Sequence, residues 1–278
     1  MMAEKSSIKK YLRGMKFPFC AGCGLFGIVD SFLRAVQELG YKNFKKFVFC
    51  SGIGCSSWIP SPFFLADSIH TLHGRSIPVA TGIKLRRPDL NVVVFGGDGD
   101  LMGIGLGHFM HAARRNLDIL VVMSNNMIYG MTGGQVAPTT PFGAITTTTP
   151  YGNFEQPFDA ASLAVAAGAT FSARWTTAHL KELKKTIKIA LGLNGFRFIE
   201  VVSHCPTGFG RKRGLKTPQE FVDWVRDNAI SIGEARKIGK NKQKNKIVIG
   251  EFIRKPRLTL IENIYAITRE AQKLGKEN

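Results

Sequence analysis

Short aliphatic runs alternate along this chain with longer segments in which apolar residues recur at helical spacing. The run Asn91-Val-Val-Val-Phe95 is continuous, which is typical of a strand buried on both faces. Such runs predict strands at residues 47–49, 91–95, 117–124, 170–173 and 197–202. Helical spacing predicts helices at residues 25–39, 101–115, 160–167 and 177–191. Strands separated by helices form parallel βαβ units, so we predict an α/β fold with a doubly wound, mostly parallel sheet and helices on both faces.

Two stretches follow neither period and are predicted to be loops, at residues 60–74 and 129–156. The second is rich in Gly, Thr and Pro, and a loop of that length inside a compact domain is usually functional. After about Lys212 the pattern breaks down into charged segments. We therefore predict one domain over residues 1–210 and a basic C-terminal extension over residues 211–278, which packs against a partner or is partly mobile.

The composition is that of a globular protein. Of the 278 residues, 44% are hydrophobic, which is enough to bury a large core. No stretch approaches the roughly 18 uncharged apolar residues of a membrane-spanning helix, and the N-terminus carries no secretory signal. We expect a soluble, cytoplasmic protein that does not bind a membrane. Its five cysteines are then free thiols, metal ligands or cluster ligands rather than a disulfide framework.

The charge of the chain is strongly positive. A net charge of +18 favours anionic partners such as nucleic acid, a phosphorylated cofactor or an acidic protein, although a solvated basic surface explains it equally well. Much of the excess lies in Arg211-Lys212-Arg213 and between Lys237 and Lys246. None of the known nucleic-acid-binding signatures is present, so we do not expect nucleic acid as a partner.

A glycine-rich turn follows the strand at residues 91–95, with the sequence Gly96-Gly97-Asp98-Gly99-Asp100. Glycines between a strand and a helix let the backbone approach a phosphate, and the helix N-terminus favours negative charge. Ligands of open α/β sheets bind at the carboxyl ends of strands, where this turn lies. A lone Gly-Asp-Gly is nevertheless more often an ordinary tight turn.

The next strand adds a second polar group, because it ends in Asn125-Asn126. Two neighbouring parallel strands would present Asp98 and Asn126 side by side. A carboxylate and an amide oxygen, together with a backbone carbonyl and phosphate oxygens, suit the octahedral coordination of Mg²⁺. The two turns together therefore predict a magnesium site that holds a phosphorylated ligand.

The strand–Gly-Asp-Gly–helix–strand–Asn-Asn arrangement resembles the motif that binds thiamine diphosphate. The resemblance implies three Mg²⁺ ligands: Asp98, the side chain of Asn126 and the carbonyl of Ile128. It places Gly97, Gly99 and Asp100 in the turn that binds the diphosphate. Asn125 is interpreted as a turn residue.

Thiamine enzymes also need a glutamate that hydrogen-bonds the aminopyrimidine ring, and they carry it on a different domain from the diphosphate site. This chain has no glutamate between Glu38 and Glu155, a span that holds both turns. We therefore hypothesise that a partner subunit supplies the activating glutamate and that the cofactor lies at the interface between the two subunits.

Two of the cysteines have the spacing of a zinc half-site or a redox pair, although a single pair can also arise by chance. Cys20 and Cys23 form a C-x₂-C pair, and Cys55 and Cys205 follow later in the chain. Four cysteines suit either tetrahedral zinc or an iron–sulfur cluster, and the spacing alone slightly favours zinc. Pro206, directly after Cys205, favours a cluster. Cys50 lies within a predicted strand and is interpreted as a small buried hydrophobe.

The chain as a whole resembles the β subunits of 2-oxoacid:ferredoxin oxidoreductases, and among these it is most similar to the 2-oxoglutarate enzymes. Six stretches carry the resemblance, in order: FCAGCGLFGIVDSFLRA (19–35), SGIGCSS (51–57), HTLHGRSIPVATGIKLRRPDL (70–90), FGGDGDLMGIGLGHFMHAARRN (95–116), SNNMIYGMTGGQVAPTTPFG (124–143) and HCPTGFGRK (204–212). They cover about the first three-quarters of the chain.

This family oxidatively decarboxylates a 2-oxoacid on thiamine diphosphate, passes electrons through a [4Fe–4S] cluster to ferredoxin and releases an acyl-CoA. The resemblance therefore implies Mg²⁺, thiamine diphosphate and the cluster as cofactors. Its implied partners are an α subunit with the activating glutamate, ferredoxin, CoA and the oxoacid, in a hetero-oligomer. The implied cluster ligands are Cys20, Cys23, Cys55 and Cys205.

The resemblance also implies residues around the cofactor. Cys55 lies in a turn that faces the thiamine, together with Ile53, Gly54 and Ser56. His73 and Cys55 are the implied catalytic residues, although a loop histidine is often structural. The backbone of Gly130, Met131 and Thr132 is expected near the diphosphate and thiazolium; Met131 props the cofactor or simply fills the core. The remaining candidates, which either reach the substrate or cap turns, are Thr139 and Thr140.

The substrate prediction rests on the stretches YGMTGGQ, APTTPFG and YGNFEQPFD, which look most like enzymes acting on 2-oxoglutarate. Relatives with lysine in place of Gly133 tend to use pyruvate or a broader range of oxoacids. The alternative readings are a pyruvate or branched-chain oxoacid enzyme and, from a different class, a non-catalytic basic protein that binds nucleic acid or acts as a scaffold.

Overall fold

The computed structural model describes residues 7–243 and 246–274. Within these residues, eight strands form one sheet in the order β2-β1-β3-β4-β6-β5-β8-β7. Every pairing is parallel except that of β5 with β8. The strand bounds are β1 Phe47–Ser51, β2 Asp67–His70, β3 Asn91–Gly97, β4 Leu120–Asn125, β5 Phe171–Thr176, β6 Arg197–Val202, β7 Ala229–Ser231 and β8 Ile247–Arg254.

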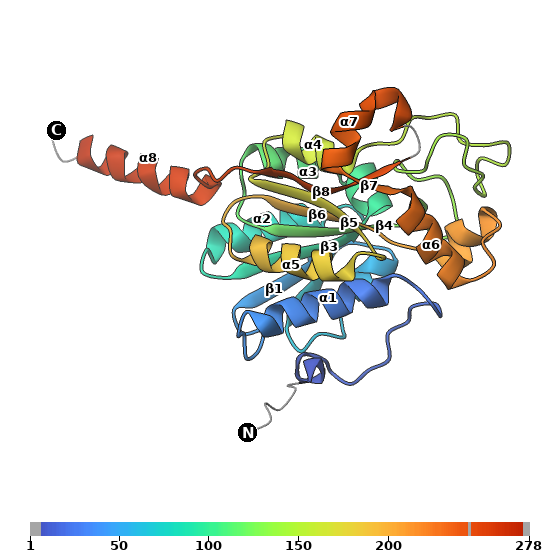
Figure 1. The fold of residues 1–278 in the computed structure, drawn as a ribbon. Coiled ribbons are helices and arrows are strands. Elements are labelled where there is room, and N and C mark those ends of the chain that lie inside the picture. The colour runs from blue at the N-terminus through green and yellow to red at the C-terminus, as the bar shows by residue number, and fades with distance from the viewer. Residues whose placement is uncertain (1–6, 244–245, 275–278) are drawn as a thin grey trace, which may run out of the picture.

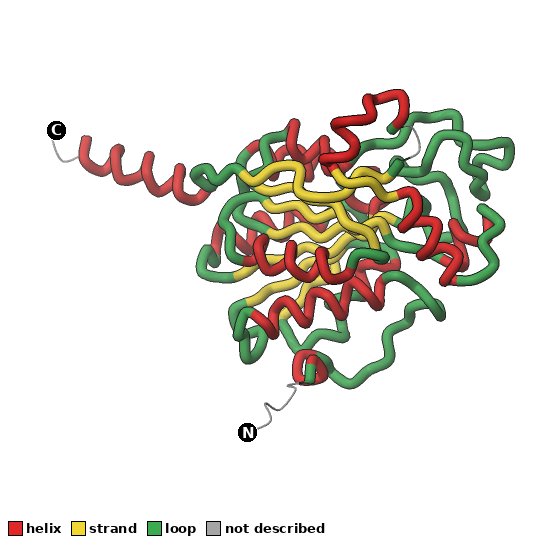
Figure 2. Tube along the Cα trace, viewed as in Figure 1, coloured by secondary structure: helices red, strands yellow, loops and turns green. Residues whose placement is uncertain are grey.

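Helices cover both faces of this sheet (Figures 1 and 2). On one face α1 and α5 pack side by side, and on the other lie α2, α3 and α4. The helix bounds are α1 Leu25–Glu38, α2 Ser76–Arg86, α3 Leu106–Arg114, α4 Ala160–Ala166, α5 Leu180–Leu191, α6 Pro218–Asn228, α7 Ile232–Lys242 and α8 Leu260–Leu274. The predicted α/β fold with a doubly wound, mostly parallel sheet is confirmed.

Strand β3 shows why the sheet is buried on both sides. Val93 and Phe95 face the core under α1 and α5, whereas Val92 and Val94 face the core under α2 and α3. Alternate side chains of a strand point to opposite faces, so a continuous apolar run serves both cores. In the first core, the ring of Phe32 on α1 packs edge-on against Phe95, with 5.1 Å between ring centroids.

Several predicted boundaries were wrong. The stretch 60–74 was expected to be a loop but contains β2, an edge strand whose largely exposed residues lack an apolar pattern. The helix expected over residues 101–115 is interrupted, because Gly103 is not helical: a π-type segment, η3 (Gly99–Ile104), precedes α3. The helix α2 was not expected. Three elements begin later than predicted: β4, β5 and α5.

The region after residue 211 contributes to the sheet through β8, which pairs with β5. The extension predicted for this region therefore does not stand wholly apart from the first domain, and the boundary between residues 210 and 211 stays a prediction. Helix α8 projects away from the body (Figure 1). Among the described helices, none combines the length and the apolar character that crossing a bilayer requires.

The topology brings the candidate residues to one edge of the sheet. Strands β1, β3, β4 and β6 are neighbours and run parallel, so their carboxyl ends meet at the same edge. The loops that leave this edge begin at residues 52, 98, 126 and 203. Each of them carries a predicted ligand: Cys55, Asp98, Asn126 and Cys205 respectively.

Candidate cofactor site and cysteine cluster

Asp98 lies at the end of β3, directly beside the end of β4. Its carboxylate is 2% exposed and accepts a hydrogen bond from the Thr139 hydroxyl at 2.5 Å. Backbone amides of Gly99 and Asn126 also donate to it. Burial outweighs these hydrogen bonds and raises the pKa of Asp98 to about 7. A buried carboxylate with neutral donors gains from a bound cation, so this side chain fits the predicted role of Mg²⁺ ligand.

The turn after β4 holds the second predicted ligand. The Asn125 side-chain oxygen accepts the amide of Met127 at 3.0 Å, and the Asn126 oxygen accepts the amide of Ile128 at 3.2 Å. Met127 adopts a φ of +63°, a conformation that non-glycine residues avoid unless their surroundings enforce it. Asn125, predicted to be a turn residue, is instead the last residue of β4, and its side chain caps the turn that follows. The backbone amide of Asn126 in this turn donates to Asp98.

The glycines of the first turn leave space for neighbouring groups. A β-carbon added to Gly99 would lie 2.2 Å from the ring of Tyr129, whose hydroxyl donates to the Gly99 carbonyl at 3.2 Å. A β-carbon on Gly97 would lie 3.5 Å from the hydroxyl of Ser56. The loop after β1 therefore reaches the glycine-rich turn that begins at Gly97. Ser56 and Gly97, both predicted to lie near the cofactor, are close to each other.

Asp100 joins three loops through its buried carboxylate. The carboxylate accepts the amides of Gly74 at 2.7 Å and Ile53 at 3.2 Å. The Nδ1 atom of His73 lies 2.8 Å from the same oxygen, close enough for an ion pair with a protonated ring. Burial raises the pKa of Asp100. Its contacts are with protein groups, so direct contact with the cofactor stays a prediction, but the carboxylate positions His73.

The four ligand-like cysteines come together at the same edge. The charges of Cys205, Cys55 and Cys20 each act on Cys23, and burial together with these charges raises the pKa of Cys23 to about 12. The Thr207 hydroxyl donates to the sulfur of Cys20 at 3.5 Å and contacts that of Cys205 at 3.9 Å. Within residues 7–243 and 246–274, no three His, Cys, Asp or Glu side chains converge tightly enough to hold a single metal ion.

The cysteines adjoin the turn at residues 126–128, the predicted magnesium turn, through Gly130. A β-carbon on Gly130 would lie 3.4 Å from the side-chain nitrogen of Asn126 and 3.7 Å from the sulfur of Cys205. A β-carbon on Gly208 would lie 3.1 Å from the same sulfur and 3.6 Å from Ile128. The two predicted cofactor sites are therefore neighbours. Cys50, in contrast, is fully buried in the core under α2, as predicted for a small hydrophobe.

The long loop between β4 and α4 closes one side of the site. The hydroxyl of Thr132 donates to the side chain of Gln135 at 2.6 Å, and Met131 is exposed rather than part of the core. Thr140 donates to the Met127 carbonyl at 2.6 Å, so it holds the magnesium turn. Of the two threonines considered as substrate contacts, Thr139 thus binds Asp98 and Thr140 supports a turn.

A buried ion-pair network behind the site was missed from the sequence. Glu200 on β6 accepts the Asn125 amide at 2.7 Å with one oxygen and Arg174 at 2.7 Å with the other. Arg174 also pairs with Asp159. One signal in the sequence could have revealed this network: Arg174 and Glu200 each lie inside an apolar strand. Charged residues are rarely buried in such a strand unless they are paired.

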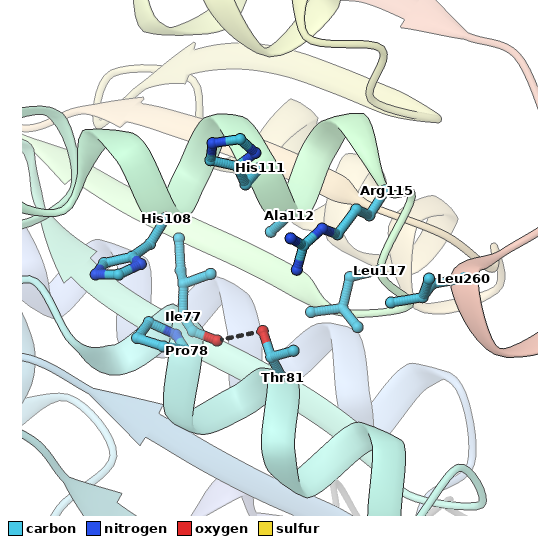
Figure 3. Close-up of a pocket in the computed structure, with 9 residues that line it drawn as sticks. All are labelled: Ile77, Pro78, Thr81, His108, His111, Ala112, Arg115, Leu117 and Leu260. Carbon is cyan, nitrogen blue, oxygen red and sulfur yellow. Dashed lines mark hydrogen bonds between the residues drawn. The ribbon is translucent and has the colours of Figure 1, made fainter. Parts of the chain in front are cut away.

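A separate cavity of about 140 Å³ lies between α2 and α3 (Figure 3). Thr81, His108, His111 and Arg115 line it, together with Leu260 at the start of α8. It contains none of the predicted site residues. The candidate site lies elsewhere, in the loops that follow the carboxyl ends of β1, β3, β4 and β6.

Comparison with known proteins agrees with this geometry. Residues 52–201 match the family model for the thiamine pyrophosphate enzyme, C-terminal TPP binding domain. The chain is 46% identical over 260 residues to the 2-oxoglutarate synthase subunit KorB of Methanocaldococcus jannaschii, a match that covers 93% of this chain and 96% of that one. The chain belongs to the family of 2-oxoacid:ferredoxin oxidoreductase β subunits. The family resemblance predicted from the sequence is thereby confirmed.

Other members of this family are also similar. The KorB subunit of Archaeoglobus fulgidus is 51% identical over 205 residues, which cover 73% of this chain and 76% of that one. A solved structure of the 2-oxoglutarate:ferredoxin oxidoreductase from Magnetococcus marinus, with 2-oxoglutarate, coenzyme A and succinyl-CoA bound, superposes with a TM-score of 0.85. It is 36% identical, and the match covers 97% of this chain and 92% of that one. This β subunit is thus part of an oxidoreductase with a thiamine-diphosphate-binding domain.

Proposed function

We propose that this β subunit binds Mg²⁺–thiamine diphosphate and a [4Fe–4S] cluster in a CoA-dependent 2-oxoglutarate:ferredoxin oxidoreductase. In this reaction 2-oxoglutarate loses CO₂, CoA takes up the succinyl group, and the electron pair leaves one electron at a time to ferredoxin. The observation that supports the proposal most strongly is that Gly130 lies close both to the side chain of Asn126 and to the sulfur of Cys205. It joins a diphosphate turn to a set of four cysteines.

Bound thiamine diphosphate supplies the carbanion chemistry of decarboxylation, and the cluster supplies one-electron transfer. The protein residues provide binding and orientation. Asp98, Asn126 and the Ile128 carbonyl would hold Mg²⁺, and the other candidates would surround the cofactor. These are Ile53, Gly54, Cys55, Ser56, His73, Gly97, Gly99, Asp100, Gly130, Met131 and Thr132. His73, positioned by Asp100, is the proposed polar group facing the substrate.

The activating glutamate is proposed to come from the α subunit. Two described glutamates near the site are engaged elsewhere: Glu38 pairs with Lys184 and Lys188 on the helical surface, and Glu200 is committed to Arg174 and Asn125. A third, Glu155, lies exposed in the long loop. The loops around the site also expose apolar side chains of the kind that mark protein interfaces. The most exposed are Leu72, next to His73, and Tyr151 and Phe154 in the long loop.

The proposed substrate is 2-oxoglutarate, which the M. jannaschii and A. fulgidus relatives carry in their names. The alternative is a wider range of oxoacids, as the name of the 2-oxoacid:ferredoxin oxidoreductase β subunit of Saccharolobus solfataricus implies for that protein; it is 47% identical over 190 residues. Rates of ferredoxin reduction by the complete complex with 2-oxoglutarate and with pyruvate decide between them. A faster rate with pyruvate would contradict the proposal.

The cluster has its own test. Anaerobically purified protein is expected to be brown, with broad visible absorbance, and to hold iron and sulfide. Cys20→Ala is expected to lose most of this absorbance because it removes one of four ligands. Cys50→Ala, which changes a buried thiol outside the set, is expected to keep it. A colourless wild-type protein that contains zinc would contradict the cluster.

The buried network gives a prediction for Glu200. Glu200→Gln keeps the shape of the side chain, but one end of its amide would present N–H groups to Asn125 or to Arg174. Asn125 would then lose the geometry that holds Met127, and the magnesium turn would shift. Since such supporting residues typically change metal affinity by about 10- to 100-fold, we expect a loss in that range.

Calorimetric titration with thiamine diphosphate at saturating Mg²⁺ measures this effect. The matched control is Glu251→Gln, which removes an exposed carboxylate paired with Arg254 on β8. A folded Glu200→Gln protein with unchanged affinity would show that the network does not support the turn.

A further inference from the structure

A strongly basic loop lies directly after the last cysteine of the set. We call it the basic loop and define it as residues 211–216, between the π-type turn η4 (Pro206–Gly210) and α6. Its four cationic residues are exposed: Arg211, Lys212, Arg213 and Lys216. The segment contains no acidic residue, and within the described part of the chain none of the four side chains forms an ion pair. The loop therefore presents a net positive charge to solvent.

Both ends of the basic loop are fixed to the cysteines. At its start, the amide of Gly210 donates to the Cys205 carbonyl at 3.0 Å. At its end, Pro218 packs so closely on Gly22, between Cys20 and Cys23, that a β-carbon there would lie 2.3 Å from the proline ring. The basic loop thus lies between two segments that carry proposed cluster ligands.

Part of the basic loop is also held in shape. The guanidinium of Arg213 stacks 4.6 Å from the ring of Trp224 and 5.3 Å from that of Phe209. The amide of Leu215 donates to the Gly210 carbonyl at 3.0 Å. Docking on a preorganised loop costs less conformational entropy than docking on a free one, so Arg211 and Lys212 are displayed on a stable support.

The proposed exit point for electrons, at Cys20, lies next to the basic loop. Of the four clustered cysteines, Cys20 is exposed, whereas Cys23, Cys55 and Cys205 are partly buried. In the segment just before Cys20, the ring of Phe17 stacks on the rings of Phe19 and Phe63. Because electron transfer slows steeply with distance, an acceptor has to approach the exposed edge at Cys20, which neighbours Thr207 and therefore the start of the basic loop.

We propose that the basic loop is the docking surface for an acidic one-electron carrier of the ferredoxin class, an inference that rests on the proposed function. Complementary charge steers such a carrier to the edge at Cys20 and raises the rate of encounter more than the final affinity. The nearest acidic residues on α6 offset only part of this charge: Asp223 pairs with Arg226, and Glu220, which accepts the backbone amide of Lys216, brings one negative charge against four positive ones.

The test uses the complete complex of this subunit with its α subunit. The variant Arg211→Glu/Lys212→Glu reverses two charges of the basic loop. The control Lys42→Glu/Lys45→Glu makes the same change in net charge before β1, at the opposite edge of the sheet. Surface plasmon resonance with an oxidised ferredoxin measures the association rate at low and at physiological salt. The rate at which 2-oxoglutarate reduces methyl viologen measures turnover independently of ferredoxin.

We expect charge reversal in the basic loop to lower the association rate at least about 10-fold at low salt and to flatten its salt dependence, with viologen reduction unchanged. The control is expected to associate nearly as fast as the wild type. Equal slowing of both variants would overturn the proposal, because only net charge would then matter. An association rate that the charge reversal leaves unchanged would also overturn it. A wild-type complex that binds ferredoxin but fails to reduce viologen would instead refute the proposed function.

Discussion

Asp98→Asn is expected to weaken Mg²⁺-dependent binding of thiamine diphosphate at least about 100-fold and to abolish turnover. Substitutions beside a metal ligand already cost 10- to 100-fold, so loss of the ligand's charge is expected to cost at least the upper figure. Asparagine has the size of aspartate and can still accept the hydrogen bond from Thr139. The change therefore removes the negative charge while leaving the packing nearly intact.

Calorimetry with thiamine diphosphate, in Mg²⁺ and in EDTA, measures the effect, and thermal unfolding followed by circular dichroism reports on the fold. Asp89→Asn is a suitable control, because Asp89 is exposed and pairs with Arg87 far from the site. If folded Asp98→Asn protein bound the cofactor within a few-fold of the wild type, the magnesium site would have to be placed elsewhere.

The part of the site that could be predicted from the sequence is the part encoded locally. Asp98 and Asn126 each follow an apolar strand directly, so strand prediction alone placed them at the same edge of a parallel sheet. The C-x₂-C pair likewise marked Cys20 and Cys23. Grouping Cys55 and Cys205 with them required family resemblance, because their proximity depends on the order of β1 and β6 in the sheet.

Contacts between segments that are distant in the sequence could not be predicted. Thr139 reaches Asp98 from the middle of a loop that has no periodic pattern. Glu200 reaches Asn125 from a neighbouring strand, and its burial is explained only once Arg174 is placed beside it. Strand β8 was missed for a related reason: its charged and glycine residues break the apolar pattern, and its pairing with β5 fixes its place.

The largest expected effect concerns the partner subunit. We propose that the glutamate for the thiamine ring comes from the partner, so the β subunit alone is expected to hold the cofactor without turning over substrate. Addition of the α subunit should complete the site and restore turnover from background to a full catalytic rate. General acid–base steps typically contribute about 10²- to 10⁴-fold, so a site without its activating carboxylate is expected to be slower by at least that range.

Matched substitutions make this expectation specific. Replacing the glutamates that flank the site in this chain, with Glu38→Gln and Glu155→Gln, should leave the rate of the complete complex nearly unchanged, since Glu38 serves surface ion pairs. A large loss of rate in either variant, with the fold and the cofactor retained, would place the activating group in this chain instead.

The central claim is that this chain forms half of a thiamine site joined to an iron–sulfur cluster. Its most direct test is the rate of 2-oxoglutarate- and CoA-dependent ferredoxin reduction, measured anaerobically while α subunit is titrated into cofactor-loaded β subunit. We predict no turnover above background without the α subunit and a rise that saturates at equal amounts of the two subunits. Full turnover by the β subunit alone would contradict the claim.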